Sequence, residues 1–254
     1  MKKIVLTGGA NGIGRAIVES LAGKAELYVI DRDQEAGEAL EKKLPSSHTH
    51  FFYGDLASQT VLKEFARFVT ERTNQIDGFI HNAAINNGGL VSGATYDDFM
   101  EVLKVNVGTA YYLTQQFEED FSDSASIILM SSTRNRQSME NNESYSSSKG
   151  ALLSLSHAMA NSLRSKARVN VISPGWIETS DFQFEKQEME LSTSDHSQHL
   201  VGRVGYPVDI FHMVEFLLDE NKSGFITGQE FVVDGGMSKQ MIYHEEHGWE
   251  YNNE

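Results

Sequence analysis

The chain of 254 residues has no cysteine and no long apolar run, and it carries far fewer basic than acidic residues. Without cysteine it can form no disulfide, no thiolate nucleophile and no cysteine-ligated metal site, which fits a reducing compartment. A membrane-spanning helix needs about 20 consecutive apolar residues, and no stretch reaches that length. The first residues, MKKIVLTGG, contain an apolar run of only three residues before Thr7, too short for a signal peptide. We therefore expect a cytoplasmic protein.

The charge balance limits the possible partners. The chain has 21 Lys and Arg against 36 Asp and Glu, a formal charge of −15 at pH 7. Nucleic acids and anionic membrane surfaces are polyanions, and they repel a chain of this charge. We expect neither as a partner.

The histidines raise the question of a metal site. Nine are present, with His48 close to His50 and His196 close to His199. Zinc hydrolases place two histidines four residues apart on a helix together with a carboxylate, and neither pair has that spacing. We expect these histidines to be solvated loop residues and the chain to hold no metal.

Short apolar runs alternate with longer amphipathic ones along the whole chain. The runs predict strands at 3–7, 26–31, 49–53, 77–82, 126–132, 167–173 and 230–236, and the amphipathic stretches predict helices at 13–23, 33–43, 58–73, 97–119, 144–166 and 207–219. Strands that are apolar on both sides are typical of a buried parallel sheet. The alternation therefore predicts an α/β fold, a single domain with a doubly wound parallel sheet and helices on both faces.

Two segments stand outside this alternation. The polar stretch 180–203 interrupts it late in the chain, and we expect a mobile lid over a site there. The last residues, 238–254, are acidic but contain large apolar side chains, which a purely disordered tail rarely exposes to water. We expect one domain over 1–237 and a tail that docks on the site or on a neighbouring subunit, with Trp249 and Tyr251 beside the lid.

A glycine-rich turn follows the first strand. Gly8, Gly12 and Gly14 allow the backbone to approach a ligand, and the next helix offers free N–H groups to a pyrophosphate. Asp31 ends the second strand at about the 20-residue offset from which an acid binds the ribose hydroxyls of a dinucleotide. A carboxylate there repels the extra phosphate of NADP, whereas Arg32 could accept it. NAD is the expected cofactor, and NADP is the alternative.

Together, several motifs resemble one family. TGGANGIG, GDLAS, HNAAI, the asparagine of KVNVGTAYYLTQ, the serine of IILMSSTR, YSSSK, SPGWIET and VVDGGM occur in the order and spacing of the short-chain dehydrogenases/reductases, from about residue 4 to residue 237. The resemblance implies a Rossmann fold and a nicotinamide dinucleotide. It also implies cofactor contacts from Gly8, Asn11, Gly12, Ile13, Gly14, Asp31, Arg32, Asp55, Leu56, Asn82, Ala83, Ala84, Tyr145, Lys149, Pro174, Gly175, Ile177 and Thr179.

The same resemblance implies four catalytic residues: Asn106, Ser132, Tyr145 and Lys149. A free phenol has a pKa near 10, so Tyr145 needs a nearby cation to carry a proton at neutral pH. Lys149, four residues further along the same helix, could supply that charge and, as in the family, hold the cofactor ribose. Ser132 would hydrogen-bond the substrate oxygen, and Asn106 would hold a water that connects Lys149 to solvent.

Two positions depart from the family pattern. His81 and Ala84 stand where the family has asparagine and glycine, so the fourth strand must be held in a different way.

The expected substrate wall is polar. It comprises TRNRQSMENNE after Ser132, together with Asn86, Asn87, Trp176 and the segment 180–203, and it carries Arg134 and Arg136. A sugar, polyol or small hydroxy acid fits such a wall better than a steroid does. We expect an NAD(H)-dependent oxidoreductase that interconverts a secondary alcohol and its ketone. An NADP-preferring carbonyl reductase and a non-catalytic dinucleotide sensor are the alternatives.

The family also implies an assembly. Its members pack the helices corresponding to 107–117 and 151–163 against a partner subunit, and these helices here are rich in apolar residues. We expect a homotetramer, with a dimer as the alternative.

Overall fold

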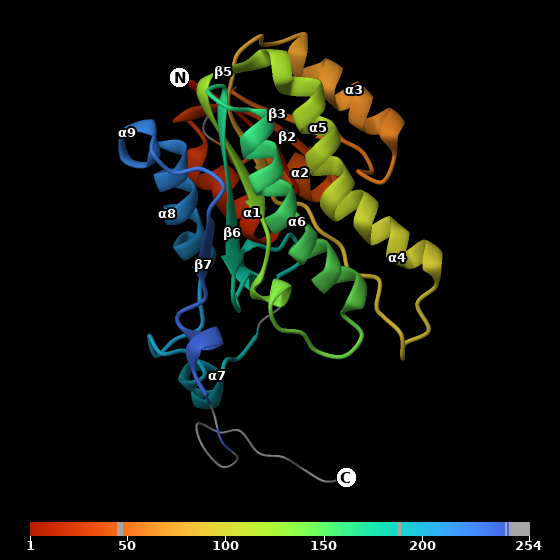
Figure 1. The fold of residues 1–254 in the computed structure, drawn as a ribbon, viewed down its shortest axis with the longest axis vertical. Helices are drawn as coiled ribbons and strands as arrows, with labels where there is room; N and C mark the ends of the chain where they lie inside the picture. The colour runs from red at the N-terminus through yellow and green to blue at the C-terminus, as the bar shows by residue number, and fades with distance from the viewer. Residues whose placement is uncertain (45–47, 187–188, 242, 244–254) are drawn as a thin grey trace.

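The computed structural model describes residues 1–44, 48–186, 189–241 and 243. Within them, one sheet of seven parallel strands forms the centre of the molecule, in the order β3-β2-β1-β4-β5-β6-β7 (Figure 1). The strands are β1 Lys2–Thr7, β2 Ala25–Asp31, β3 Thr49–Tyr53, β4 Ile76–His81, β5 Phe121–Met130, β6 Ala167–Pro174 and β7 Glu230–Val233. All neighbouring strands pair in parallel, so the predicted parallel sheet is confirmed.

Helices cover both faces of the sheet, as predicted. One layer contains α3, α4, α5 and α6, and the other contains α1, α2, α8 and α9 (Figure 1). Their bounds are α1 Gly12–Leu21, α2 Gln34–Glu41, α3 Gln59–Thr70, α4 Tyr96–Leu103, α5 Thr109–Phe117, α6 Glu143–Ser162, α7 Thr193–Ser197, α8 Pro207–Leu218 and α9 Glu220–Ser223. This is the doubly wound Rossmann arrangement.

Side chains of β1 show why the strands read as continuous apolar runs. Ile4 and Leu6 pack into the core shared with α1 and α8, whereas Val5 points the other way, into the core of α3, α5 and α6. None of the three is more than 1% exposed. Because successive residues of a strand face opposite sides, a sheet buried on both faces needs an apolar residue at every position.

The strand order reverses direction at β1 and β4. The chain moves outward from β1 to β2 and β3, then returns to β4 on the other side of β1. In such sheets the crevice at the carboxyl ends of these two strands is the usual ligand site, since the connecting helices diverge there. Thr7 and His81, the last residues of β1 and β4, lie at this point.

The chain is helical over the predicted 97–119, but it does not form a uniform α-helix there. A π-helical turn, Lys104–Gly108, lies between α4 and α5, with Asn106 at its centre. A π-helical turn adds one residue to the helix. The apolar residues keep nearly the same spacing before and after it, so the sequence pattern does not reveal the turn. Insertions of this kind often mark functional positions in helices.

None of the described helices is long and apolar enough to cross a membrane. Of the tail, the structure describes 238–241 and Tyr243; the predicted packing of Trp249 and Tyr251 concerns residues outside the described part of the chain.

Candidate active site

The glycine-rich turn between β1 and α1 leaves space that a larger residue would fill. Gly12 has a φ of +60°, in the left-handed region that favours glycine. A Cβ on Gly14 would lie 1.8 Å from the carbonyl oxygen of Gly8, so only glycine allows α1 to start so close to β1. Asn82 braces the turn because its Nδ2 donates to the same Gly8 carbonyl at 2.8 Å. The turn therefore fits the phosphates of a dinucleotide.

Backbone groups fix the acid at the end of β2. The Asp31 carboxylate accepts hydrogen bonds from the N–H groups of Ala10 at 2.8 Å and Asp33 at 3.0 Å. Asp33 in turn accepts from Asn11 Nδ2 at 2.8 Å and from the N–H of Ala36 at 3.0 Å, which caps α2. The two carboxylates are held at the edge of the crevice and cannot turn away from a bound group.

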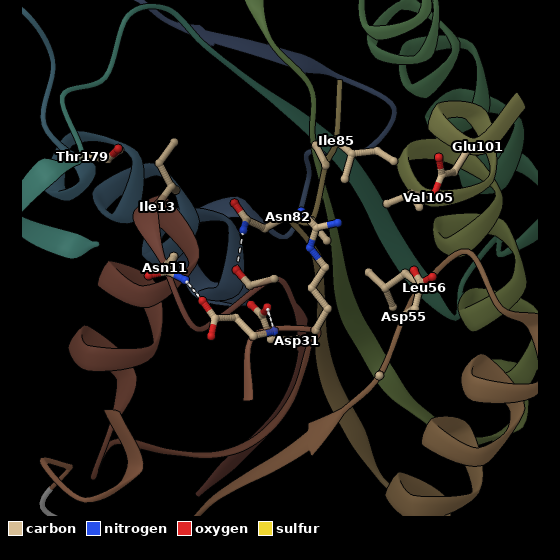
Figure 2. A pocket seen from close by; sticks show the side chains of 16 residues that line it. Asn11, Ile13, Asp31, Asp55, Leu56, Asn82, Ile85, Glu101, Val105 and Thr179 are labelled. Carbon is tan, nitrogen blue, oxygen red and sulfur yellow. Dashed lines mark hydrogen bonds between the residues drawn. The ribbon is translucent and has the colours of Figure 1, made fainter. Parts of the chain in front are cut away.

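A cavity connects this acidic edge to the end of β4. In Figure 2, Asn11 and Ile13 lie on one side of it, Glu101 and Val105 on the other, and Asp31 between. Its lining includes these predicted cofactor residues: Gly8, Asn11, Ile13, Asp31, Arg32, Asp55, Leu56, Asn82, Ala83, Ala84 and Thr179. The other predicted residues shape the turn (Gly12, Gly14), lie on α6 (Tyr145, Lys149), end β6 (Pro174) or follow it (Gly175, Ile177).

The sequence analysis missed five residues that line the cavity: Asp33, Gly54, Ile85, Glu101 and Val105. Asp33 could have been found, since it follows Asp31 by two residues and precedes a helix. Glu101 and Val105 are four residues apart, but nothing in the sequence distinguishes this pair from any other on an amphipathic helix.

His81 holds β4 in place of the family's asparagine. Its Nδ1 lies 3.0 Å from Thr7 Oγ1, and its Nε2 lies 3.0 Å from the carbonyl oxygen of Asn106. A carbonyl only accepts, so Nε2 carries the proton and Nδ1 accepts from the Thr7 hydroxyl. The Thr7 oxygen accepts in turn from the N–H groups of Asn82 and Ala83. One neutral imidazole thus connects β1, β4 and the π-helical turn.

Burial, together with the charge of Lys149, lowers the pKa of His81 to about 3, while the bond to Asn106 opposes the shift. Between pH 6.5 and about 3 the unfolded histidine binds a proton that the folded one does not, so the free energy of unfolding falls as the pH falls through this range.

We expect the free energy of unfolding of His81→Asn to fall less over this pH range than that of the unmodified chain, because asparagine does not titrate. Thermal midpoints at pH 7 and below measure it. Exposed His157, changed to Asn, is the control; equal acid sensitivity of His81→Asn and the unmodified chain would contradict the assignment.

Asn106 joins three elements from the π-helical turn. Its Oδ1 accepts from the N–H of Ile85 at 2.8 Å, and its Nδ2 donates to the Ile85 carbonyl at 3.0 Å and to Ser148 Oγ at 2.9 Å. The residue is fully buried. Both Nδ2 protons are engaged, whereas Oδ1 and the main-chain carbonyl each accept one of these bonds and keep a second lone pair at which a water could be held.

Lys149 is a buried cation without an acidic partner in the described chain. It is 2% exposed, and its Nζ donates to the carbonyl of Met130, the last residue of β5, at 2.7 Å. Burial lowers its pKa to about 7. Its Nζ lies 5.3 Å from the ring centre of Tyr145, one helical turn away on α6. The two residues are therefore neighbours on the inner face of the helix.

Tyr145 and Ser132 meet across the end of β5. Burial raises the pKa of Tyr145, while a hydrogen bond from Ser132 and the charge of Arg134 lower it. Ser132 also accepts from the N–H of Arg134 at 3.2 Å, which starts a short 3₁₀ turn, Thr133–Asn135. Serine, tyrosine and lysine thus come together at one point, next to the end of the crevice.

A second cavity of about 530 Å³ adjoins this cluster. It is lined by Ser132, Thr133, Arg134, Gln137, Ser138, Met139, Gly175, Trp176, Ile177 and Met237. Of the predicted substrate wall, Arg136 lies elsewhere and pairs with Glu230. Asn86 and Asn87 are hydrogen-bonded to Asn142 and Glu101 and do not line this cavity.

None of the described residues of the predicted lid, 180–203, lines either of these two cavities, but one part of it contacts a residue that lines the crevice. Phe184 donates its N–H to Asn11 Oδ1 at 2.8 Å, so this part lies over the start of α1. Further on, the N–H of Val201 donates to the Gly235 carbonyl at 3.1 Å. The position beside the site agrees with the expectation, and mobility stays a prediction.

The prediction of solvated histidines was wrong for His199, which is only 3% exposed and lies against the ring of Trp176 at 6.2 Å between ring centres. It follows α7, a short helix that the polar sequence did not reveal. Among the described residues no cluster of His, Cys, Asp and Glu could hold a metal ion.

Comparison with known proteins agrees with this geometry. The family model that matches residues 8–238 is described as enoyl-(acyl carrier protein) reductase. An uncharacterized oxidoreductase of Thermotoga maritima is 38% identical over 252 residues, with 96% of this chain and 98% of that protein covered. L-fucose dehydrogenase of Mus musculus is 31% identical, with 92% and 88% covered. An apo SCOR enzyme from Clostridium thermocellum superposes with a TM-score of 0.89 at 34% identity, with 100% and 99% covered.

The chain belongs to the short-chain dehydrogenase/reductase family. It is an oxidoreductase by this membership, and its family binds a nicotinamide dinucleotide, which the glycine-rich turn and the crevice beside it fit.

Proposed function

We propose that this protein is an NAD(H)-dependent oxidoreductase that interconverts a secondary alcohol and its ketone on a small polar molecule. The observation that carries the proposal is the meeting of Ser132, Tyr145 and Lys149 between a dinucleotide-sized crevice and a second, polar cavity. A bound nicotinamide supplies or takes up the hydride. The chain's own residues orient the substrate and move the proton.

Tyr145 is the proton carrier in this proposal. Its raised pKa keeps the phenol protonated at neutral pH, ready to donate to the oxygen of a ketone. Ser132 holds the same oxygen by a hydrogen bond, which fixes the carbonyl carbon toward the crevice. In the opposite direction, Lys149 and Arg134 stabilise the phenolate that must take the proton from an alcohol. Lys149 would also bind the cofactor ribose, and Asn106 holds the helix that carries both groups.

Cofactor choice follows from the charges around the crevice. Its lining contains Asp31, Asp33, Asp55 and Glu101 against a single cation, Arg32. An additional phosphate at the adenosine ribose would enter a negative region, so NAD is favoured over NADP. Arg32 supports the alternative of an NADP-preferring reductase, since it lines the same crevice.

The polar second cavity favours a sugar, polyol or small hydroxy acid. The relative named L-fucose dehydrogenase carries a sugar in its name, and its 31% identity supports that substrate class for this chain. The direct test is a panel of polyols, hydroxy acids, sugars and simple ketones read by NADH absorbance. Turnover of at least one compound with NAD(H) supports the proposal. Tight dinucleotide binding without any turnover would favour the dinucleotide-sensing alternative.

We propose a homotetramer as the assembly. Phe225, between α9 and the edge strand β7, is fully exposed in the single chain, and Leu153 and Leu155 on α6 are only partly covered. Large apolar groups in such positions are usually buried against another subunit. Light scattering should give four times the 28.3 kDa of one chain. A monomer mass at micromolar concentration would contradict the proposal.

A further inference from the structure

The substrate cavity beside Tyr145 contains one charged residue among its described lining. That residue is Arg134, and the other lining residues are neutral. The chain has a net charge of −15, but no acid among the described residues lines this cavity beside the cation. A positive charge in such a cavity attracts an anion.

The acid that could neutralise this region is engaged elsewhere. Glu230 pairs with Arg136 and also accepts from Asn135 Nδ2 at 2.7 Å and Ser173 Oγ at 2.8 Å. Within the described chain the Arg134 guanidinium has no ion pair and no hydrogen bond. Other arginines are paired, as Arg15 with Glu19 and Arg203 with Asp209.

The position of Arg134 relative to the chemistry is fixed by the 3₁₀ turn. Its N–H donates to the hydroxyl of Ser132, so the catalytic serine and the cation are held together. The side chain also acts on the phenol, since its charge lowers the pKa of Tyr145. Arg134 and Ser132 also line the same cavity of about 530 Å³. An acid group bound to Arg134 and a ketone oxygen held by Ser132 would share this one cavity, which favours a short molecule.

We propose that Arg134 binds a carboxylate of the substrate, and that the substrates are short hydroxy acids and the corresponding 2-oxo or 3-oxo acids. A guanidinium binds a planar carboxylate through two parallel hydrogen bonds. Phosphate dianions are usually held by several cations or a helix N-terminus, and this cavity offers one cation. The inference rests on the proposed function and narrows its substrate class from polar molecules to acids.

The chemistry stays that of the family. The carbonyl carbon of the oxo acid accepts the hydride of the reduced nicotinamide, and its oxygen takes the proton of Tyr145, which gives the hydroxy acid and the oxidised cofactor. In the other direction Tyr145 takes the hydroxyl proton and the carbinol hydride returns. Arg134 does not change the electron balance; it places the acid with its keto oxygen against Ser132.

The kinetic test compares 2-oxobutyrate and 3-oxobutyrate with their methyl esters, which keep the ketone and lose the charge. We expect the unmodified enzyme to prefer the acids by about 30-fold in kcat/KM, the scale of a hydrogen-bonded charge pair. Arg134→Gln should raise KM for the acids by a similar factor and leave KM for the esters unchanged. If the loss of the Arg134 charge also lowers kcat by changing the pKa of Tyr145, this fall in kcat should be equal for acids and esters. Arg67→Gln, at an exposed position on α3, removes the same charge far from the site and should change neither.

A binding test separates this inference from the reaction itself. The tertiary alcohol 2-hydroxyisobutyrate cannot be oxidised, and its amide is the neutral control. Calorimetry on the enzyme–NAD complex should show that the acid binds and that the amide does not. This difference in affinity should disappear in Arg134→Gln and be partly retained in Arg134→Lys. If this pattern appears while no compound turns over, the proposed activity fails and the carboxylate site stands. The inference would be overturned if the acid and the amide bound equally well, or if the enzyme preferred the esters or a phosphorylated ketone. It would also be overturned if Arg134→Gln changed KM equally for acid and ester.

Discussion

Replacing Tyr145 with phenylalanine is expected to reduce kcat by about 10³-fold while leaving the affinity for NADH unchanged. The phenol is hydrogen-bonded to Ser132 and lies beside Lys149, where it can donate a proton to the substrate oxygen. Phenylalanine keeps the ring, its packing and the crevice, so the loss falls on the chemical step alone. A cofactor-binding role would instead weaken NADH binding.

Turnover and fluorescence titration with NADH on the same preparation measure the two quantities. Tyr111→Phe, an exposed tyrosine on α5, is the matched control and should behave as the unmodified enzyme. Near-normal turnover of Tyr145→Phe would remove this residue from the mechanism.

The second large effect is expected at Asp31. Asp31→Asn should raise kcat/KM with NADP by about 10²-fold relative to NAD, because it removes a fixed negative charge where the extra phosphate would lie. The N–H groups of Ala10 and Asp33 donate to different oxygens of Asp31, and asparagine keeps only one acceptor oxygen, so one of the two bonds is lost. Both cofactors use the same turn, so the ratio of kcat/KM with NADP to that with NAD reports the lost charge better than either value alone.

Steady-state kinetics with both cofactors, before and after the exchange, give the ratio. Arg32→Ala is the informative companion, since it removes the one cation that lines the crevice. The unmodified enzyme could instead have equal kcat/KM with NAD and NADP, and Arg32→Ala could then lose the activity with NADP. This result would mean that Arg32 and not Asp31 decides the preference.

Much of the fold could be predicted from local pattern. The predicted strand at 49–53 has the same first and last residues as β3. Polar segments on both sides of the short apolar run mark where the strand begins and ends. The predicted helices at 13–23 and 207–219 begin within one residue of α1 and α8. Glycines at 8, 12 and 14, and the tyrosine–lysine spacing, placed the site at the right edge of the sheet.

Other features depend on contacts between distant residues, which local pattern does not contain. Asn106 lies in the π-helical turn, and its side chain bonds to Ile85 and Ser148, which are distant in the sequence. The sequence indicated that His81 must act differently from asparagine, but its bond to the Asn106 carbonyl needs the two elements side by side. The free charge of Arg134 could not be distinguished from the paired charge of Arg136, since only the fold brings Glu230 to one of them.

Transfer of an isotopic label tests the central proposal most directly. NADH that carries deuterium at its transferable position is incubated with the unmodified enzyme, a ketone of the panel and, in parallel, Tyr145→Phe. We predict deuterium at the carbinol carbon of the product, at a rate that the variant lowers by about 10³-fold. If NADH binds and none of the sugars, oxo acids or simple ketones gains deuterium, the chain is not the oxidoreductase that we propose.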